Sequence, residues 1–363
     1  MKRKFNVGII GGTGYVGQRF VTLLNNHPWF KVTTIAASPR SAGKTYLETM
    51  QGRWKINADM PDSVKDIIVQ DSADLDKFIN DLDFVFCAVD MDKEALITLE
   101  ETIAKHEVAV VSNNSANRWT ADVPMIIPEI NPEHSALIEA QRKRLGTKNG
   151  FIAVKPNCSI QSYVPTLTPL RDYGIEKIQV STYQAVSGAG KTLTEWPEIM
   201  GNVIPFIGGE EEKSEKEPLK VWGSINQAAT AIDLAENILI SAQCYRVAVQ
   251  DGHLAAVSVA FNEKPDRQDI LDAWKNFKPY PQEKELPSAP RPFLQYLEAD
   301  DRPQQRLDAE FGNGFGVSIG RLRKDSIFDY KFACLSHNTI RGAAGGAILT
   351  AELLVDQGYI TLK

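Results

Sequence analysis

Hydrophobic and polar positions in the N-terminal half alternate between short apolar runs and segments with helical spacing. Apolar runs occupy residues 5–10, 32–37, 83–89 and 108–111, and each has the length of a buried strand. Apolar residues recur at helical spacing after the first run, and again over residues 93–106. Strands that alternate with helices predict an α/β fold with a Rossmann-like, doubly wound parallel sheet.

The second half of the chain shows a different pattern. Residues 177–186 and 255–261 alternate or run apolar like sheet strands, and residues 225–238 have the spacing of a helix. Residues 279–303 hold six prolines and many charges. We expect an extended surface excursion there, because a strand-like run resumes at residues 316–319. This half is predicted to be α+β.

Composition and charge exclude several classes of protein. A chain of 363 residues suits two domains, and 43% hydrophobic with 24% charged residues is ordinary for a globular protein. The net charge of −6 does not favour a nucleic-acid surface, and no apolar run approaches the roughly 18 residues of a membrane helix. We therefore expect a small-molecule substrate, and neither nucleic acid nor a membrane, as partner.

The four cysteines, Cys87, Cys158, Cys244 and Cys334, are widely scattered. That distribution favours reduced thiols over a disulfide framework. The basic N-terminus leads into a strand pattern and lacks the apolar core of a signal peptide. We expect a cytoplasmic protein.

A glycine-rich turn follows the first strand and opens the first helix. It consists of Gly11, Gly12, Thr13, Gly14, Tyr15, Val16 and Gly17. Such glycines permit a tight turn and a close approach of a pyrophosphate to the helix N-terminus. The alternative is a turn without a ligand, but the flanking strand and helix favour a dinucleotide site.

The end of the second strand indicates which dinucleotide binds. An acidic residue there would accept the ribose 2′-hydroxyl of NAD, but this chain has Ser38, Arg40 and Ser41. An arginine flanked by hydroxyls suits a 2′-phosphate, so NADP is the predicted cofactor. The alternative is a solvated turn.

Cys158 lies between Asn157 and Ser159, just after the apolar run 151–154. This position predicts a cysteine at a strand-to-helix turn, where backbone N–H groups favour a thiolate. A thiolate attacks carbonyl carbon, and an amide donor steadies the oxyanion. A reactive thiol together with a hydride carrier restricts the possible reactions to two: oxidation of an aldehyde through a thioester, or the reverse reduction of an acyl group.

Among five histidines, His253 is the candidate proton partner, because it ends a strand-like segment that also contains Arg246. We expect His27, His106 and His134 to be exposed turn residues. His337, just before the C-terminal helix, is a weaker catalytic candidate.

Charged and amide side chains suggest an anion pocket. Glu210 and Lys213 are three residues apart and can share a helix face, although a solvated helix start is the alternative. Arg118 follows the strand at 108–111, where ligands bind in open α/β sheets, and Gln184 precedes a second glycine turn. No cluster has metal-ligand spacing, so no metal is predicted.

Together these motifs resemble the aspartate-β-semialdehyde dehydrogenase family, and above all its archaeal and fungal branch. The matching segments run in the family's order over nearly the whole chain: residues 11–17, 114–118, 156–159, 183–190, 210–213, 246–253, 302–308 and 342–344.

The resemblance implies a reaction, the reversible NADPH-dependent reduction of β-aspartyl phosphate to aspartate semialdehyde, in the biosynthesis of lysine, threonine and methionine. It implies that Cys158 is the nucleophile, that His253 is the acid and base, that Gln184 positions the acyl group, and that Asn157 orients the thioester or its oxyanion.

The resemblance also implies binding roles. Arg118 and Lys213 would bind phosphate, Arg246 the substrate carboxylate, and Glu210 the substrate ammonium group. The implied cofactor residues beyond the glycine turn are Ser38, Arg40 and Ser41 at the 2′-phosphate, Ser187 and Gly188 beneath the cofactor, and Asn338 near the nicotinamide.

The family's architecture implies two domains and an oligomer. Residues 1–157, completed by a C-terminal helix at 338–363, would bind NADP, and residues 158–337 would form the catalytic and dimerisation domain. The assembly would be a homodimer or a homotetramer.

Three other readings compete. Malonyl-CoA reductase resembles the same branch, but Glu210 and Lys213 favour an amino-acid phosphate. N-acetyl-glutamyl-phosphate reductase has the same architecture, but Asn157 and Ser159 argue against it. A non-catalytic NADP-binding regulatory protein would lack a reactive thiol at Cys158.

Overall fold

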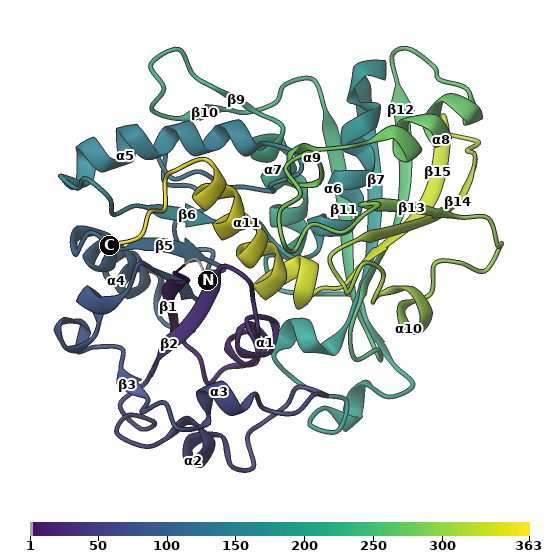
Figure 1. Ribbon diagram of the computed structural model, residues 1–363. Coiled ribbons are helices and arrows are strands. Elements are labelled where there is room, and N and C mark those ends of the chain that lie inside the picture. Colours follow the sequence, from purple (N-terminus) through teal and green to yellow (C-terminus); the bar gives the residue numbers. More distant parts are fainter. Residues whose placement is uncertain (1–2) are drawn as a thin grey trace.

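The apolar runs of the N-terminal half form a six-stranded parallel sheet in the computed structural model, which describes residues 3–363 (Figure 1). The strand order is β3-β2-β1-β4-β5-β6, which confirms the predicted doubly wound α/β fold. The strands are β1 (Phe5–Ile10), β2 (Phe30–Ala37), β3 (Gln70–Asp71), β4 (Phe84–Cys87), β5 (Ala109–Ser112) and β6 (Ile152–Val154).

Helices cover both faces of this sheet, which explains why its strands β4, β5 and β6 are almost entirely apolar. Val7 and Ile9 of β1 belong to a core shared with α1 and α11, whereas Ile10 belongs to the core that contains α4. The helices of this half, and the C-terminal helix that joins them, are α1 (Tyr15–Leu23), α2 (Tyr46–Met50), α3 (Asp62–Lys65), α4 (Lys93–Lys105), α5 (Ile138–Leu145) and α11 (Gly345–Asp356).

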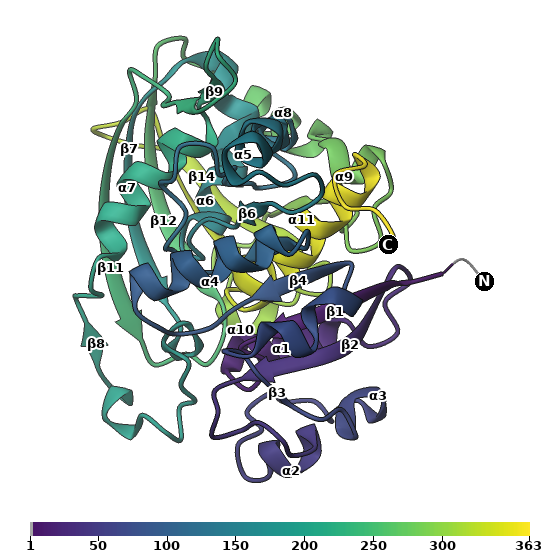
Figure 2. The same ribbon diagram turned by 90° about the vertical axis from the view of Figure 1, so that its left-hand side faces the viewer.

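A mixed sheet of seven strands forms the centre of the second half of the described chain. Its order is β13-β14-β15-β12-β7-β11-β8, and Figure 2 shows the long strands β7, β11 and β12 side by side. The strands are β7 (Ile175–Gln184), β8 (Val203–Ile204), β11 (Leu239–Val247), β12 (His253–Phe261), β13 (Leu294–Leu297), β14 (Val317–Lys324) and β15 (Tyr330–Ser336).

The helices of this half are short, and α7 and α8 are the longest of them. They are α6 (Ile160–Leu167), α7 (Glu210–Val221), α8 (Arg267–Asn276), α9 (Tyr280–Glu283) and α10 (Gln305–Asp308). Helix α6 packs against β12, β14 and β15, and α7 packs against β11. The predicted α+β character of this half is therefore observed, while the domain boundary at residues 157 and 158 stays a prediction.

The predicted helix over residues 225–238 is wrong. The chain instead forms a small hairpin of β9 (Ser224–Ile225) and β10 (Ile232–Asp233). The Asn226 side chain accepts the backbone N–H of Thr230, and Ala229 and Asn237 adopt positive φ. Local side-chain bonding and left-handed residues end a helix, and the apolar spacing alone did not reveal them.

The segment 279–303 is only partly the expected surface excursion. Residues Leu294–Leu297 form β13, which pairs in parallel with β14 and extends the second sheet at its edge. Leu286 and Phe293 are buried in the cores. The many prolines of this segment led us to miss strand β13, in which Leu294 is buried in the core.

The C-terminal segment returns across the molecule to the first sheet, drawn in yellow in Figure 1. It begins with a π-helical turn at Ile340–Ala344, in which Gly342 N–H bonds to the His337 carbonyl and Ala344 N–H to the Thr339 carbonyl. Arg341 of this turn is fully buried and paired with Glu129. This pair ties the turn to the loop after β5.

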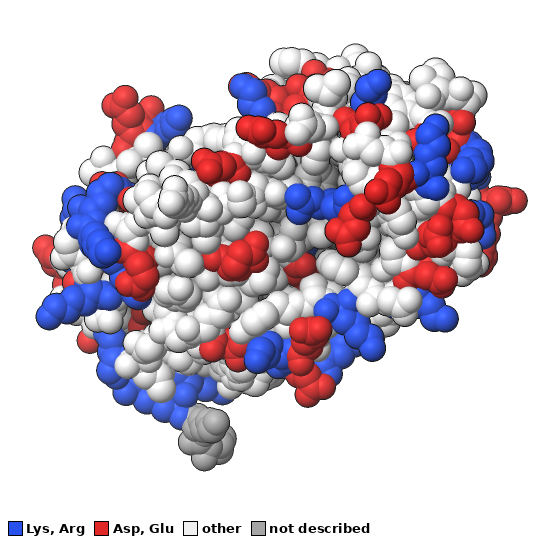
Figure 3. All heavy atoms as spheres, turned by 90° about the horizontal axis from the view of Figure 1, so that it is seen from above, with Lys and Arg blue, Asp and Glu red and all other residues white. Residues whose placement is uncertain are grey.

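Acidic and basic side chains are mixed over the face shown in Figure 3, and no large region of one sign stands out there. Within residues 3–363, no helix is long and apolar enough to cross a membrane.

Loss of one partner of the buried Arg341–Glu129 pair should destabilise the protein strongly. Glu129→Gln leaves a buried guanidinium without its counter-charge, and we expect the free energy of unfolding to fall by about 3 kcal/mol in urea denaturation. The control is Glu139→Gln, which removes the exposed partner of Arg142 and should change stability by less than about 0.5 kcal/mol. Equal stabilities of the two variants would contradict this account.

Candidate active site

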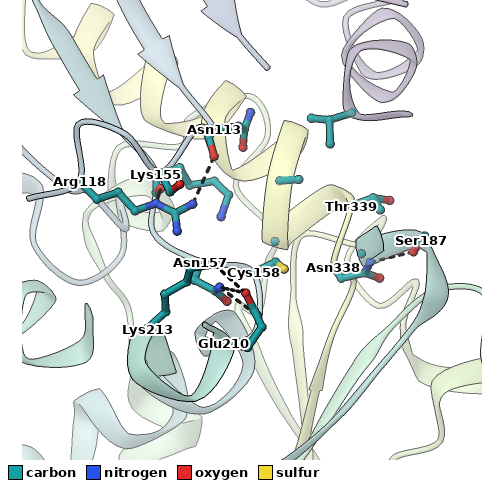
Figure 4. A pocket seen from close by; sticks show the side chains of 15 residues that line it. Asn113, Arg118, Lys155, Asn157, Cys158, Ser187, Glu210, Lys213, Asn338 and Thr339 are labelled. Atoms are coloured by element: carbon teal, nitrogen blue, oxygen red, sulfur yellow. Dashed lines mark hydrogen bonds and ion pairs between the residues drawn. The ribbon is translucent and has the colours of Figure 1, made fainter. Parts of the chain in front are cut away.

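A cavity of about 250 Å³ lies where the carboxyl ends of β5 and β6 approach the second sheet (Figure 4). Both sheets and the C-terminal segment contribute to its wall. The sequence-predicted residues that line it are Val16, Arg118, Asn157, Cys158, Ser187, Gly188, Glu210, Lys213 and Asn338.

Cys158 lies at the predicted strand-to-helix turn, between the end of β6 and the start of α6. The π-helical turn passes directly over it. A Cβ atom on Gly342 would lie 2.8 Å from the Cys158 Cβ, so only glycine allows the chain to approach this closely. The thiol is thus enclosed on one side by backbone and open to the cavity on the other.

His253 is the predicted proton partner, and the structure places it beside the thiol. Its Nε2 lies 3.5 Å from the Cys158 Sγ, although the two residues are 95 positions apart. The imidazole is buried at the start of β12, and its Nδ1 accepts the backbone N–H of Ala185 at 3.1 Å. Strand pairing between β7 and β12 brings this N–H to the ring.

The protonation state of Cys158 differs from the thiolate that the sequence predicts. Burial raises the pKa of the Cys158 thiol to about 11, and the Glu210 carboxylate raises it further. Burial lowers the pKa of His253 to about 3, with Arg246 adding to the shift and the Gly252 carbonyl opposing it. At neutral pH the free site therefore holds a thiol beside a neutral imidazole, because desolvation outweighs the N–H groups of the turn.

Glu210 and Lys213 lie on the first turn of α7, as their spacing predicts. Lys213 Nζ donates to Glu210 Oε1 at 3.1 Å, and Asn157 Nδ2 donates to both carboxylate oxygens at 2.9 and 3.0 Å. Gln184 Nε2 lies 3.4 Å from Glu210 Oε2. The carboxylate is therefore oriented by three donors at the edge of the cavity.

Arg118 is buried and held by three acceptors. Its guanidinium donates to the carbonyls of Lys155 and Asn113 and to Glu217 Oε1 at 2.9 Å. The other Glu217 oxygen accepts the backbone N–H of Asn157 at 2.6 Å. One buried carboxylate thus connects the arginine to the turn that carries the thiol.

The loop that presents Arg118 is organised by a second buried carboxylate. Glu100 of α4 accepts the Ser112 hydroxyl at 2.5 Å and the side-chain amides of Asn114 and Asn117 at 3.1 and 2.7 Å. Because every contact goes to a charged acceptor, the loop has one preferred arrangement.

Arg246 lies behind the cavity wall. Its Nη1 donates to the Ala185 carbonyl at 2.7 Å. A Cβ on Gly188 would lie 3.0 Å from this nitrogen and 3.2 Å from His253 Nε2, so Gly188 leaves room for both side chains. Asn338 donates to Ser187 Oγ at 2.8 Å and accepts the Gly252 N–H at 2.8 Å, which fixes the adjoining wall.

The glycine turn has the shape that a dinucleotide needs. Gly11 has φ +89°, and a Cβ on Gly17 would lie 2.3 Å from the Gly11 carbonyl oxygen. Helix α1 has no side-chain cap at its N-terminus, which leaves N–H groups there for a pyrophosphate. Thr13, Gly14 and Tyr15 complete the turn, and Val16 reaches the cavity.

The proposed 2′-phosphate residues follow β2. Ser38 and Arg40 are exposed, and Ser41 is buried. No ion pair involves Arg40 in the described part of the chain, so its guanidinium is free for an anion. Arg53, which the sequence analysis missed, lies 3.4 Å from Ser41 Oγ and adds a second cation at this end.

The expectation for two of the other histidines is wrong. His27 and His134 are buried and hydrogen-bonded, to Glu352 and Asn131 respectively, because both lie at core boundaries rather than in open turns. His106 is partly exposed, and His337 is buried near Glu310.

Several cavity residues were not identified from the sequence: Asn113, Ser115, Lys155, Thr339 and Gly342. The missed signal at Lys155 was a charged residue directly after an apolar strand. Both side-chain amide atoms of Asn113 are buried without a partner. Over residues 3–363, no cluster of three His, Cys, Asp or Glu side chains has the geometry of a metal site.

Two family models match the chain. Residues 6–138 match the semialdehyde dehydrogenase NAD binding domain, and residues 167–341 match the semialdehyde dehydrogenase dimerisation domain.

Relatives match over almost the full length. An aspartate-semialdehyde dehydrogenase of Archaeoglobus fulgidus is 43% identical, covering 98% of this chain and 100% of the relative. The enzyme of the same name from Aspergillus fumigatus is 41% identical, covering 98% and 99%.

Solved structures agree with the fold. The Candida albicans aspartate semialdehyde dehydrogenase with NADP superposes with a TM-score of 0.88 at 36% identity, covering 99% of this chain and 100% of that chain. A Vibrio cholerae aspartate semialdehyde dehydrogenase II complexed with ASA gives 0.73 at 26% identity, covering 98% and 100%.

Removal of the Glu210 charge should make the thiol more acidic. Because this carboxylate raises the pKa of Cys158, Glu210→Gln should lower that pKa by about one unit and speed alkylation at alkaline pH by up to about tenfold. The measurement is iodoacetamide labelling of the Cys158 peptide by mass spectrometry. Glu211→Gln, the neighbouring helix residue, is the control, and a matching acceleration there would contradict the assignment.

Proposed function

Because this chain belongs to the aspartate-semialdehyde dehydrogenase family, we propose that it reduces β-aspartyl phosphate reversibly to aspartate semialdehyde with NADPH. Phosphate is released, and the product serves lysine, threonine and methionine biosynthesis. The observation that carries this proposal is the contact between Cys158 Sγ and His253 Nε2 in a cavity bordered by the NADP turn and by cations.

The charges of the cavity suit a substrate with two anionic groups and one ammonium group. Arg118 and Lys213 line the cavity and would bind the phosphate. Arg246, which lies behind Gly188 at the cavity wall, would bind the carboxylate. Glu210, presented by Asn157 and Lys213, offers a carboxylate to the ammonium group.

The residues around the thiol divide the chemistry among them. As Cys158 Sγ attacks the acyl carbon, its proton would pass to His253 Nε2, which lies 3.5 Å away. The tetrahedral oxyanion then collapses and phosphate departs, so that a thioester remains on sulfur. NADPH, when bound, supplies the hydride that reduces the thioester. When the resulting hemithioacetal collapses to the aldehyde, the sulfur leaves as a thiolate, and His253 Nε2 would return the proton that restores the thiol.

The remaining residues act through position. Asn157 and Gln184 orient Glu210, and Asn157 Oδ1 also accepts the Ser159 N–H at 2.6 Å, which shapes the turn. In the cofactor site, the glycine turn would hold the pyrophosphate and Arg40 the 2′-phosphate. Ser187, Gly188 and Asn338 would border the nicotinamide.

The assembly in this proposal is a homodimer or a homotetramer. The exposed apolar side chains of the second sheet's edge support it. Phe206 beside β8 is 70% exposed, and Leu239 of β11 is 67% exposed. We also propose a reducing, cytoplasmic setting, since Cys87, Cys158, Cys244 and Cys334 are all unpaired.

Replacement of the nucleophile should separate catalysis from cofactor binding. Cys158→Ser should abolish phosphate-dependent reduction of NADP by aspartate semialdehyde, while NADPH affinity stays within about twofold, because the glycine turn is unchanged. Malonyl-CoA-dependent oxidation of NADPH is run in parallel. Wild-type activity with malonyl-CoA alone, or near-normal turnover of Cys158→Ser, would refute the proposal.

The cofactor preference should depend on Arg40. Arg40→Asp replaces a cation at the 2′-phosphate by an anion, and we expect the KM for NADPH to rise at least about tenfold while the KM for NADH does not rise. Lys31→Asp, at an exposed position on β2, is the matched control. The measurement is the KM for NADPH and for NADH of each variant by steady-state kinetics. An unchanged KM for NADPH in Arg40→Asp would exclude Arg40 from the cofactor site.

A further inference from the structure

The segment at residues 302–308 resembles the family, but the reaction above gives it no task. It consists of the short helix α10 and the turn before it. Gln305 is the residue of this segment that reaches toward the site, because its Nε2 donates to the Tyr183 carbonyl and to the Gly252 carbonyl, each at 3.1 Å. One side-chain amide therefore joins the end of β7 to the residue before β12.

The two carbonyls lie where the pairing of these strands is interrupted. The antiparallel ladder of β7 and β12 ends at Tyr183, and backbone bonds between the two segments resume at the Val186 N–H and the Val249 carbonyl. In the gap, His253 Nδ1 accepts a backbone N–H, and Gln305 donates to one carbonyl of each segment. Side chains thus hold the two segments together at the place where the imidazole lies.

Gly252, directly before His253, is held at both of its backbone polar groups. Its N–H donates to Asn338 Oδ1 at 2.8 Å, and its carbonyl accepts Gln305 Nε2. The residue has φ +94°, and a Cβ there would lie 3.1 Å from the Ala309 Cβ and 3.3 Å from the Gln305 Cγ. Glycine permits this conformation and this close approach, so α10 packs directly on the backbone that begins β12.

The position of Gln305 is itself fixed by a carboxylate on the same helix. Asp308 is buried, and its side chain accepts Arg302 Nε at 2.7 Å and the Gln304 N–H at 2.6 Å. Its backbone carbonyl accepts Ser318 Oγ at 3.2 Å, which connects α10 to β14. Because a charge-assisted pair and a strand hold the helix, the amide of Gln305 is presented from a fixed support.

We propose that Gln305 is a positioning residue, whose carboxamide keeps His253 Nε2 in contact with Cys158 Sγ. Gln305 acts through two backbone segments. One bears the imidazole, and the other supplies the Ala185 N–H that bonds to its Nδ1. This inference rests on the proposed role of His253 in proton transfer.

The separation of this amide from the substrate groups predicts which kinetic constant it affects. A displacement of a reacting group by about 1 Å can slow a reaction roughly 100-fold. Arg118 comes from the loop after β5, and Glu210 and Lys213 come from α7, so none of them depends on the contacts of Gln305. Loss of the amide should therefore lower kcat and leave the KM values almost unchanged.

The first test replaces Gln305 by methionine, which has the same length and no N–H group. Gln305→Met should lower kcat for phosphate-dependent reduction of NADP by aspartate semialdehyde at least about tenfold, because the imidazole is displaced from the sulfur. The KM values for phosphate, aspartate semialdehyde and NADP should stay within about twofold. Rates are expressed per NADPH site counted by fluorescence titration, so that unfolded protein does not lower kcat.

The matched control is Gln304→Met. It removes the neighbouring side-chain amide, which donates to Asp301 at the surface at 3.0 Å. Its backbone N–H still bonds to Asp308, so α10 keeps its anchor. We expect kcat of this variant to stay within about twofold of the wild type.

A second variant tests the hydrogen bonds themselves. Gln305→Glu keeps the size of the side chain but places a carboxylate, which has no hydrogen to donate, against two carbonyl oxygens. Protonation restores one donor, and the carbonyl oxygens favour the protonated form. The kcat of Gln305→Glu relative to the wild type should therefore rise at least about threefold between about pH 8 and about pH 5.5, whereas the ratio for Gln305→Met should not change.

Hydrogen exchange gives a measurement that needs no substrate. In the free enzyme, Gln305→Met should speed exchange of the Ala185 N–H at least about tenfold, measured by mass spectrometry of the peptide that contains it. This N–H is the one that bonds to His253. Exchange in β5 and α7 should be unchanged, and Gln304→Met should leave exchange at Ala185 as in the wild type.

The role of Gln305 is overturned by an unchanged kcat in Gln305→Met, by a loss that falls mainly on KM, or by a Gln305→Glu ratio that does not respond to pH. Unchanged exchange at Ala185 overturns it as well. If the wild type does not turn over aspartate semialdehyde while exchange at Ala185 responds as expected, the proposed function is refuted and the positioning of His253 by Gln305 stands.

Discussion

The Glu217 carboxylate is the interaction on which the geometry of the cavity depends. One oxygen accepts Arg118 and the other accepts the backbone N–H of Asn157, and the side chain is almost fully buried. A buried carboxylate is stable only while such donors remain in place, so movement of the thiol turn would leave an uncompensated charge. Because Glu217 lies on α7 and Arg118 on the loop after β5, the reactive turn is positioned only once the two halves of the chain have assembled.

The same burial that fixes the turn also sets its reactivity. Removal of water raises the pKa of the Cys158 thiol and lowers that of His253, so each group is neutral in the free site. A neutral thiol resists oxidation, since oxidants react with the thiolate. Burial and the Glu210 carboxylate outweigh the cations Lys155, Arg246 and Arg118, which lower the pKa of the thiol.

The local pattern of apolar residues and glycines predicted the main strands and the glycine turns of this fold. Features that depend on contacts between distant residues could not be predicted in this way. The apolar runs appeared where expected because both faces of their sheet are buried. The segment at 225–238 did not, because the Asn226 side chain bonds to Thr230 and replaces helical bonding. Lys155 was missed because its side chain packs against the C-terminal segment, far along the chain: a Cβ on Gly346 would lie 3.1 Å from the Lys155 Cδ. The contact of Cys158 with His253 likewise depends on the pairing of β7 with β12.

The π-helical turn at Ile340–Ala344 resolves a conflict between two packing requirements. Arg341 must enter the core to meet Glu129, and Gly342 must lie over Cys158, within a distance that excludes any Cβ. Neighbouring residues of a regular α-helix point about 100° apart around its axis. Arg341 and Gly342 are neighbours, so the two contacts place demands on the same turn of backbone. A widened turn, with bonds from Gly342 to His337 and from Ala344 to Thr339, lets the chain satisfy them before α11 begins. The irregular turn therefore follows from the packing of the site. Through Asn338, Thr339 and Gly342, the C-terminal segment forms the wall of the cavity between Cys158 and the first sheet.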